Sequence, residues 1–132
     1  MMDLLIAATR KPFDLAERLL GAIFPAQWNP LLNLGALGFF FYWVITASGI
    51  YVYIFFDTGV HEAYASLEYM THDQWYAAGV MRSLHRYASD ALILVMLLHF
   101  VREFGMGRFR GARWFSWVTG IFAMILIYVS GI

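Results

Sequence analysis

"RSLHRYASDALILVMLLHF", residues 82–100, is a mostly apolar stretch with a histidine near each end, His85 and His99. Its second half has the composition of a membrane helix. Fourteen residues of α-helix span about 21 Å and nearly four full turns, so both imidazoles are expected on almost the same side, at two depths. A coordinating side chain inside a membrane helix is costly and usually has a function. The histidine pair is therefore the first candidate for a functional site.

The whole chain has the composition of a membrane protein. Hydrophobic residues make up 61% of its 132 residues, against about half in a soluble domain, and mean hydropathy is +0.63. Three segments are apolar over the roughly 20 residues that a spanning helix needs, at about 34–56, 79–101 and 114–132. Backbone groups in lipid must find partners within their own segment, so we expect helices. The sequence predicts an all-α membrane protein with a transmembrane segment over 34–132.

Residues 1–33 are expected to form an N-terminal interfacial segment. In "KPFDLAERLLGAIFP", residues 11–25, helical spacing places the apolar residues on one side and the charged residues on the other. This amphipathic helix is predicted to end at Phe24-Pro25, because a residue before proline disfavours helix. A disordered tail is the alternative. The polar connector 57–78 has room for a short surface helix.

Basic residues predict the orientation. They lie before the first apolar segment and in the loop 102–113, which has four arginines, whereas the connector 57–78 has neither lysine nor arginine. By the positive-inside rule, the N-terminus and loop 102–113 face the cytoplasm and loop 57–78 faces outward, in what we expect to be a bacterial inner membrane. The net charge is zero, so nucleic acid is not an expected partner. The apolar spans make the lipid bilayer an expected partner.

Haem ligation is one interpretation of the histidine pair. The chain has no cysteine, which excludes thiolate metal sites, iron–sulfur ligation and covalent haem attachment. Imidazole is a common axial ligand of haem iron. Two imidazoles about 21 Å apart on one helix face suit two haems stacked across a bilayer. The alternative is that each histidine only donates a hydrogen bond to a neighbouring helix.

Two glycines repeat the interval of the histidines. Gly35 and Gly49 are also fourteen residues apart, in the first apolar segment. Glycine lacks a side chain, so a flat group can approach the backbone there. Close helix packing through small residues explains the same pattern.

Each histidine also has an arginine within one helical turn. Arg82 precedes His85 by three residues, and Arg102 follows His99 by three. Haem propionates need cations, and these arginines lie on the side that faces the membrane surface. Ordinary snorkelling of the arginines to the lipid headgroups is the alternative.

The motifs taken together resemble the N-terminal part of the cytochrome b family, the haem subunit of quinol:cytochrome c-type oxidoreductases. The resemblance covers nearly the whole chain. It is carried by "AERLLGAIFP", "LNLGALGFFFYWVITASGI", "AYASLEYM", "MRSLHRYASD", "LLHFVREF" and "RWFSWVTG". Its most specific feature is the fourteen-residue histidine interval combined with the fourteen-residue glycine interval.

The resemblance implies a role for each candidate residue. His85 would ligate a low-potential haem near the outer surface, and His99 a high-potential haem near the cytoplasmic surface. Arg82 would contact the propionates of the outer haem and Arg102 those of the inner haem. The glycines that admit haem would be Gly35 and Gly120 near the inner end and Gly49 near the outer end.

The resemblance also implies a partner segment. In the family the bundle has four helices, and the opposing histidine of each haem lies on the fourth, which this sequence does not contain. His61 and His72 lie in the polar connector and are expected at the surface. We therefore expect two haem b groups, each sharing its second axial ligand with a segment that is not in this chain.

By this resemblance, the chain would be part of a four-helix dihaem bundle that carries electrons across the membrane. The electrons would pass between a quinone pool and partner redox subunits, with iron–sulfur and c-type cytochrome subunits among the partners. The chain is not expected to be catalytic alone. Two alternatives are a dihaem membrane anchor of a dehydrogenase or hydrogenase and a haem-free structural membrane bundle.

Overall fold

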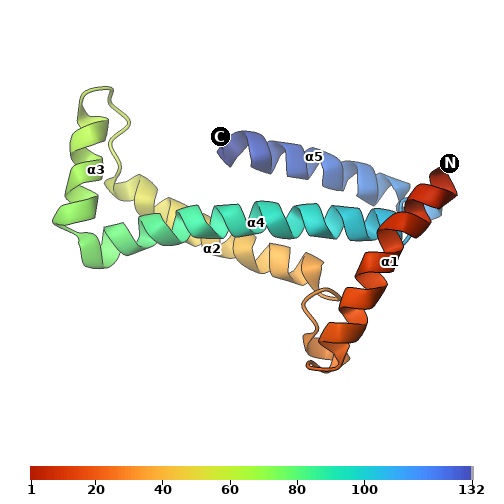
Figure 1. Cartoon of the computed structure of the whole chain (residues 1–132). Helices are drawn as coiled ribbons and strands as arrows, with labels where there is room; N and C mark the ends of the chain where they lie inside the picture. Colours follow the sequence, from red (N-terminus) through yellow and green to blue (C-terminus); the bar gives the residue numbers. More distant parts are fainter. Residues whose placement is uncertain (132) are drawn as a thin grey trace. The chain divides into compact units, whose positions relative to one another are not determined.

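The computed structural model describes residues 1–131, which are helical with no strand among them (Figure 1). The α-helices are α1 (Met2–Gly21), α2 (Leu34–Phe55), α3 (Glu62–His72), α4 (Val80–Gly105) and α5 (Trp114–Gly131). Shorter turns are η1 (Ala26–Trp28), the π-helical η2 (Trp75–Gly79) and η3 (Gly111–Arg113). The all-α prediction is confirmed.

Three helices are long and apolar enough to cross a membrane. They cover Leu34–Phe55, Trp75–Gly105 and Gly111–Gly131, so the predicted number and order of spans are confirmed. The second span is longer than predicted at both ends. The π-helical turn extends it backward to Trp75, and α4 continues to Gly105, past the charged residues Arg102 and Glu103.

The N-terminal helix differs from its prediction at both ends. α1 begins at Met2, contains Pro12 and ends at Gly21, before the predicted limit at Phe24-Pro25. The backbone N–H groups of Ile23 and Phe24 both donate to the carbonyl of Leu20, which closes the last turn early. No residue of α1 is buried, so its apolar side is available to lipid.

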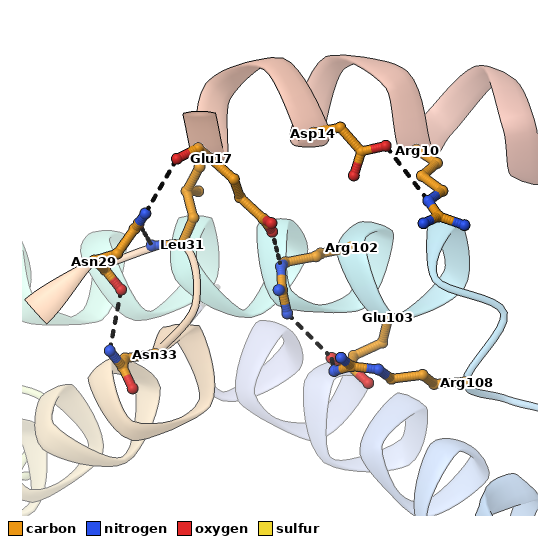
Figure 2. Close-up of polar contacts among 9 residues, drawn as sticks. All are labelled: Arg10, Asp14, Glu17, Asn29, Leu31, Asn33, Arg102, Glu103 and Arg108. Atoms are coloured by element: carbon orange, nitrogen blue, oxygen red, sulfur yellow. Dashed lines mark hydrogen bonds and ion pairs between the residues drawn. The ribbon is translucent and has the colours of Figure 1, made fainter. Parts of the chain in front are cut away.

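The chain forms two compact units, one of residues 1–38 with those from Ile93 onward, the other of residues 39–92. In the first unit, the connection between α1 and α2 is held by the buried Asn29. Its amide nitrogen donates to the Glu17 carbonyl at 3.4 Å, and its side-chain oxygen accepts from the Leu31 backbone N–H at 3.1 Å (Figure 2). The other buried residues described in this unit are Leu34, Gly38, Val95, Arg102 and Gly105.

The second unit contains most of α2, all of α3 and η2, and the first half of α4. Its buried residues are Ser48, Met70, Ala78, Ala88 and Leu92. Most large apolar side chains of the spanning helices are exposed instead, including Phe39, Ile54 and Leu94. In lipid such side chains need no protein cover, so few buried residues are expected.

Candidate functional site

In the second unit, the His85 ring lies against Gly49. A Cβ atom added to Gly49 would be 2.9 Å from Cε1 of His85 and 3.3 Å from Nδ1. Real Cβ atoms do not approach so closely, so the glycine is needed for the α4 imidazole to reach the α2 backbone. The space at Gly49 therefore receives the candidate ligand itself.

The Nδ1 atom of His85 is held by two oxygens of α2. It is 3.1 Å from the Ile45 carbonyl oxygen and 3.2 Å from the Ser48 hydroxyl oxygen. A carbonyl can only accept, so Nδ1 carries the proton and donates it, which leaves the lone pair on Nε2. Metal-ligating histidines characteristically donate their second ring N–H to such an oxygen. The geometry is that of an imidazole prepared to coordinate through Nε2.

In the first unit, the His99 ring lies beside Gly35. A Cβ atom added to Gly35 would be 3.5 Å from Cε1 and 3.8 Å from Nε2 of His99, which is ordinary van der Waals contact. Nδ1 of His99 is buried and has no hydrogen-bond partner among residues 1–131. An unpaired buried polar atom costs about 1–3 kcal/mol and calls for an explanation. A hydrogen bond from His99 Nδ1 to a group of a partner would supply one.

A cavity of about 310 Å³ lies beside His99, between α4 and α5 of the same unit. Its apolar wall includes Met96, Phe100 and Met124. Gly120 also lines it, and a Cβ atom added there would meet no described atom within 4 Å. Amphipathic ligands occupy cavities of this kind, mostly apolar with a few polar groups at one end.

The charged and hydrogen-bonding groups at the polar end of this cavity come from the last turn of α4, the segment between α4 and α5, and the start of α5. They are Glu103, Arg108, Arg113, Ser116 and the indole of Trp117. The Nε1–H of Trp117 is buried and, within the part of the chain that the structure describes, has no acceptor. An unpaired donor beside cationic side chains suits an anionic group such as a haem propionate. These polar residues would hold the carboxylates of an amphipathic ligand such as haem.

Arg102, which the resemblance implies at the propionates of the inner haem, is paired with acidic side chains. Its Nε donates to Oε1 of Glu17 at 2.8 Å, and its NH1 is 3.6 Å from Oε1 of Glu103 (Figure 2). Arg102 does not line the cavity, whereas Arg108 and Arg113 do. The sequence contained the signal for these two cations in the arginine-rich loop, but not for the pairing with Glu17, 85 positions away.

The other candidate residues are in the second unit. NH1 of Arg82 donates to the Thr71 hydroxyl at 3.1 Å, in an exposed contact. His61 and His72 are exposed, and His72 Nε2 is 3.6 Å from the Glu68 carboxylate, as expected for surface residues. The structure thus brings together His85 with Gly49 and, in the other unit, His99 with Gly35 and the cavity that Gly120 lines.

The chain has three helices that can span a membrane, and one of them carries two histidines that each lie against a glycine of α2. These features define the class: an integral membrane protein with candidate histidine-ligated cofactor sites. The family model described as Cytochrome b/b6/petB matches residues 19–132. The chain belongs to this family, whose members are membrane haem proteins of electron transfer.

Individual relatives agree. The chain is 27% identical over 118 residues to "Cytochrome b6" of Gracilaria tenuistipitata var. liui, covering 89% of this chain and 54% of that protein. It is 30% identical over 108 residues to "Cytochrome b6" of Porphyra purpurea, covering 82% and 50%. For Synechococcus sp. (strain WH7803) the figures are 29% over 117 residues, 89% and 53%. The chain spans about half the length of these curated relatives.

Proposed function

We propose that this chain is a dihaem cytochrome b segment that carries electrons across the membrane, between a quinone pool and partner redox subunits. The observation that carries the proposal is the contact of each α4 histidine with an α2 glycine. The same fourteen-residue interval separates His85 from His99 and Gly49 from Gly35. The repeated contact between an imidazole of α4 and a glycine of α2 supports two similar cofactor sites.

Each histidine would supply one axial ligand. His85 would ligate the outer haem through Nε2, the nitrogen that its hydrogen bonds leave free. His99 would ligate the inner haem beside the cavity that it lines. When bound, haem supplies an iron that accepts and releases one electron. The apolar walls of the cavity would shield part of the bound haem from water.

The charged groups would orient the inner haem. Arg113 and the Trp117 N–H would bind its propionates at the polar end of the cavity, with Arg108 close by in an ion pair with Glu103. Arg82, which is exposed near the start of α4, would bind the propionates of the outer haem. Arg102 would act on the inner haem only if its bond to Glu17 opened.

The second axial ligand of each haem would come from a further cytochrome b segment with an opposing histidine pair. Two haems with two imidazoles each need four ligands, and two of the four histidines in this chain are exposed on the connector. Further proposed partners are iron–sulfur and c-type cytochrome subunits. The N-terminus and loop 102–113 would face the cytoplasm of a bacterium and loop 57–78 the outside.

Two substitutions in the assembled membrane complex test this proposal. His85→Ala should remove the outer haem and His99→Ala the inner one, so a redox titration should resolve two components in the parent and one in each variant. His72→Ala, an exposed histidine, is the matched control and should keep both. Two intact bis-histidine haems in both α4 variants would refute the ligand assignment. A parent complex without b-type bands would favour a haem-free structural bundle.

A further inference from the structure

The two candidate ligands differ in what holds their Nδ1 atoms. Nδ1 of His85 has two oxygen partners on α2, whereas Nδ1 of His99 is buried and has none in the described residues. Each ring lies against a glycine of α2, and the ring of His85 approaches Gly49 more closely than the ring of His99 approaches Gly35. The hydrogen bonding of Nδ1 is therefore one structural difference between the two candidate haem sites.

Ser48 supplies one of the two partners. It precedes Gly49, and its residue is 1% exposed. Its hydroxyl oxygen is 2.6 Å from the Val44 carbonyl, 3.2 Å from the Ile45 carbonyl and 3.2 Å from Nδ1 of His85. The Ser48 hydroxyl donates its hydrogen bond in the shortest contact, to the Val44 carbonyl. A lone pair of the hydroxyl oxygen therefore faces the Nδ1–H of His85.

A bond from a serine hydroxyl to its own helix is common and by itself indicates nothing about function. Thr46 makes the same type of bond, to the Tyr42 carbonyl at 2.8 Å, but with an exposed contact. Ser48 differs because it is buried and also reaches the histidine. Thr46 is therefore a control on the same helix for the loss of such a bond.

We propose that Ser48 is a positioning residue for His85 and that it lowers the potential of the haem held by His85 relative to the haem held by His99. The Ser48 hydroxyl and the Ile45 carbonyl accept hydrogen bonds from the Nδ1–H of His85. These bonds would hold the ring so that Nε2 is available to the haem iron, and they would make the imidazole a stronger electron donor. A stronger donor stabilises ferric more than ferrous iron, and hydrogen bonding around the ligand is one of the ways in which a protein sets haem potential. The inference rests on the proposed dihaem function.

The test is a redox titration of the haem-containing complex carrying Ser48→Ala. Loss of one hydrogen bond should raise the equilibrium constant for reduction of the outer haem roughly two- to tenfold and leave the inner haem unchanged. Ser48→Thr, which keeps the hydroxyl, should titrate like the parent. Ser48→Cys, with a weak acceptor, should fall between them and replaces Ser48→Ala if that variant does not assemble. Thr46→Ala should leave both haems unchanged.

Three results would overturn the inference: an unchanged outer haem in both Ser48→Ala and Ser48→Cys, an equal shift of both haems, or the same shift in Thr46→Ala. These outcomes differ from failure of the proposed function, in which the parent complex would contain no bis-histidine haem. Loss of the outer haem spectrum in Ser48→Ala, together with its retention in Ser48→Thr, would support the positioning role. Threonine keeps the hydroxyl group and alanine does not.

Discussion

Replacement of Glu17 by methionine should loosen the attachment of α1 to α4 by about 3 kcal/mol, the lower end of the range of about 3–5 kcal/mol for removing one partner of a buried ion pair. In the parent, Glu17 Oε1 accepts from Nε of Arg102 at 2.8 Å, and the Arg102 side chain is only 7% exposed. Glu17→Met leaves that guanidinium buried without its main counter-charge.

The magnitude follows from the geometry. At 2.8 Å the Coulomb attraction is about 6 kcal/mol at an effective dielectric constant of about 20. The desolvation of both groups offsets part of it. Glu17 keeps 20% of its side-chain surface exposed, and Glu103 remains 3.6 Å from the guanidinium, so partial compensation is expected.

Hydrogen exchange of the α1 backbone amides in the assembled complex measures the effect, because local opening sets the exchange rate. About 3 kcal/mol corresponds to roughly hundredfold faster exchange. Asp14→Asn is the matched control. It breaks the exposed Arg10–Asp14 pair, 3.4 Å long, and should cost no more than about 1 kcal/mol.

The double variant Glu17→Met, Arg102→Met completes the experiment. It buries no unpaired charge and should recover most of the lost protection, since apolar replacement of a buried pair is often neutral. The reasoning fails if the α1 amides of Glu17→Met exchange no faster than those of Asp14→Asn. It also fails if the double variant loses as much protection as Glu17→Met and Arg102→Met lose together when each is made alone.

Three further predictions concern the glycines and the cavity. Gly49→Ala should lower the free energy of unfolding by about 1–3 kcal/mol in thermal unfolding, because its Cβ would be 2.9 Å from His85. Gly35→Ala should cost less, since its Cβ would be 3.5 Å from His99. Equal costs would contradict the difference between these two distances. Gly120→Ala should leave the stability of the haem-free protein unchanged, because no described atom lies within 4 Å of the added Cβ, and it should weaken retention of the inner haem. A large loss of stability in the haem-free protein would show that the space at Gly120 is not open. Trp117→Phe should speed extraction of the inner haem alone, and unchanged extraction would remove the indole N–H from the propionate site.

The sequence by itself determined the spans and the candidate ligands. The length and hydropathy of a segment are local properties, so three membrane helices could be predicted within a few residues. The interval between His85 and His99 is also local, because helical geometry converts fourteen positions into one face and two depths. The motifs around these positions were sufficient to indicate the family.

The end of α1 was less predictable. Pro25 marked a limit, but the helix closes at Gly21 because two backbone N–H groups compete for the Leu20 carbonyl. Such bifurcated ends depend on the geometry of the last turn, and residue preferences describe that geometry only on average.

Only the tertiary structure decided which groups meet. Arg102 lies one turn from His99 in the sequence, and its closest partner in the structure is Glu17, 85 positions away. Nothing in the sequence distinguished Ser48, which reaches from α2 to His85 on α4, from Thr46, whose hydrogen bond stays within α2 and is exposed. A hydrogen bond forms only when two atoms approach within about 3 Å. Which side chains from distant segments come that close is set by the packing of whole helices, and no local pattern specifies it.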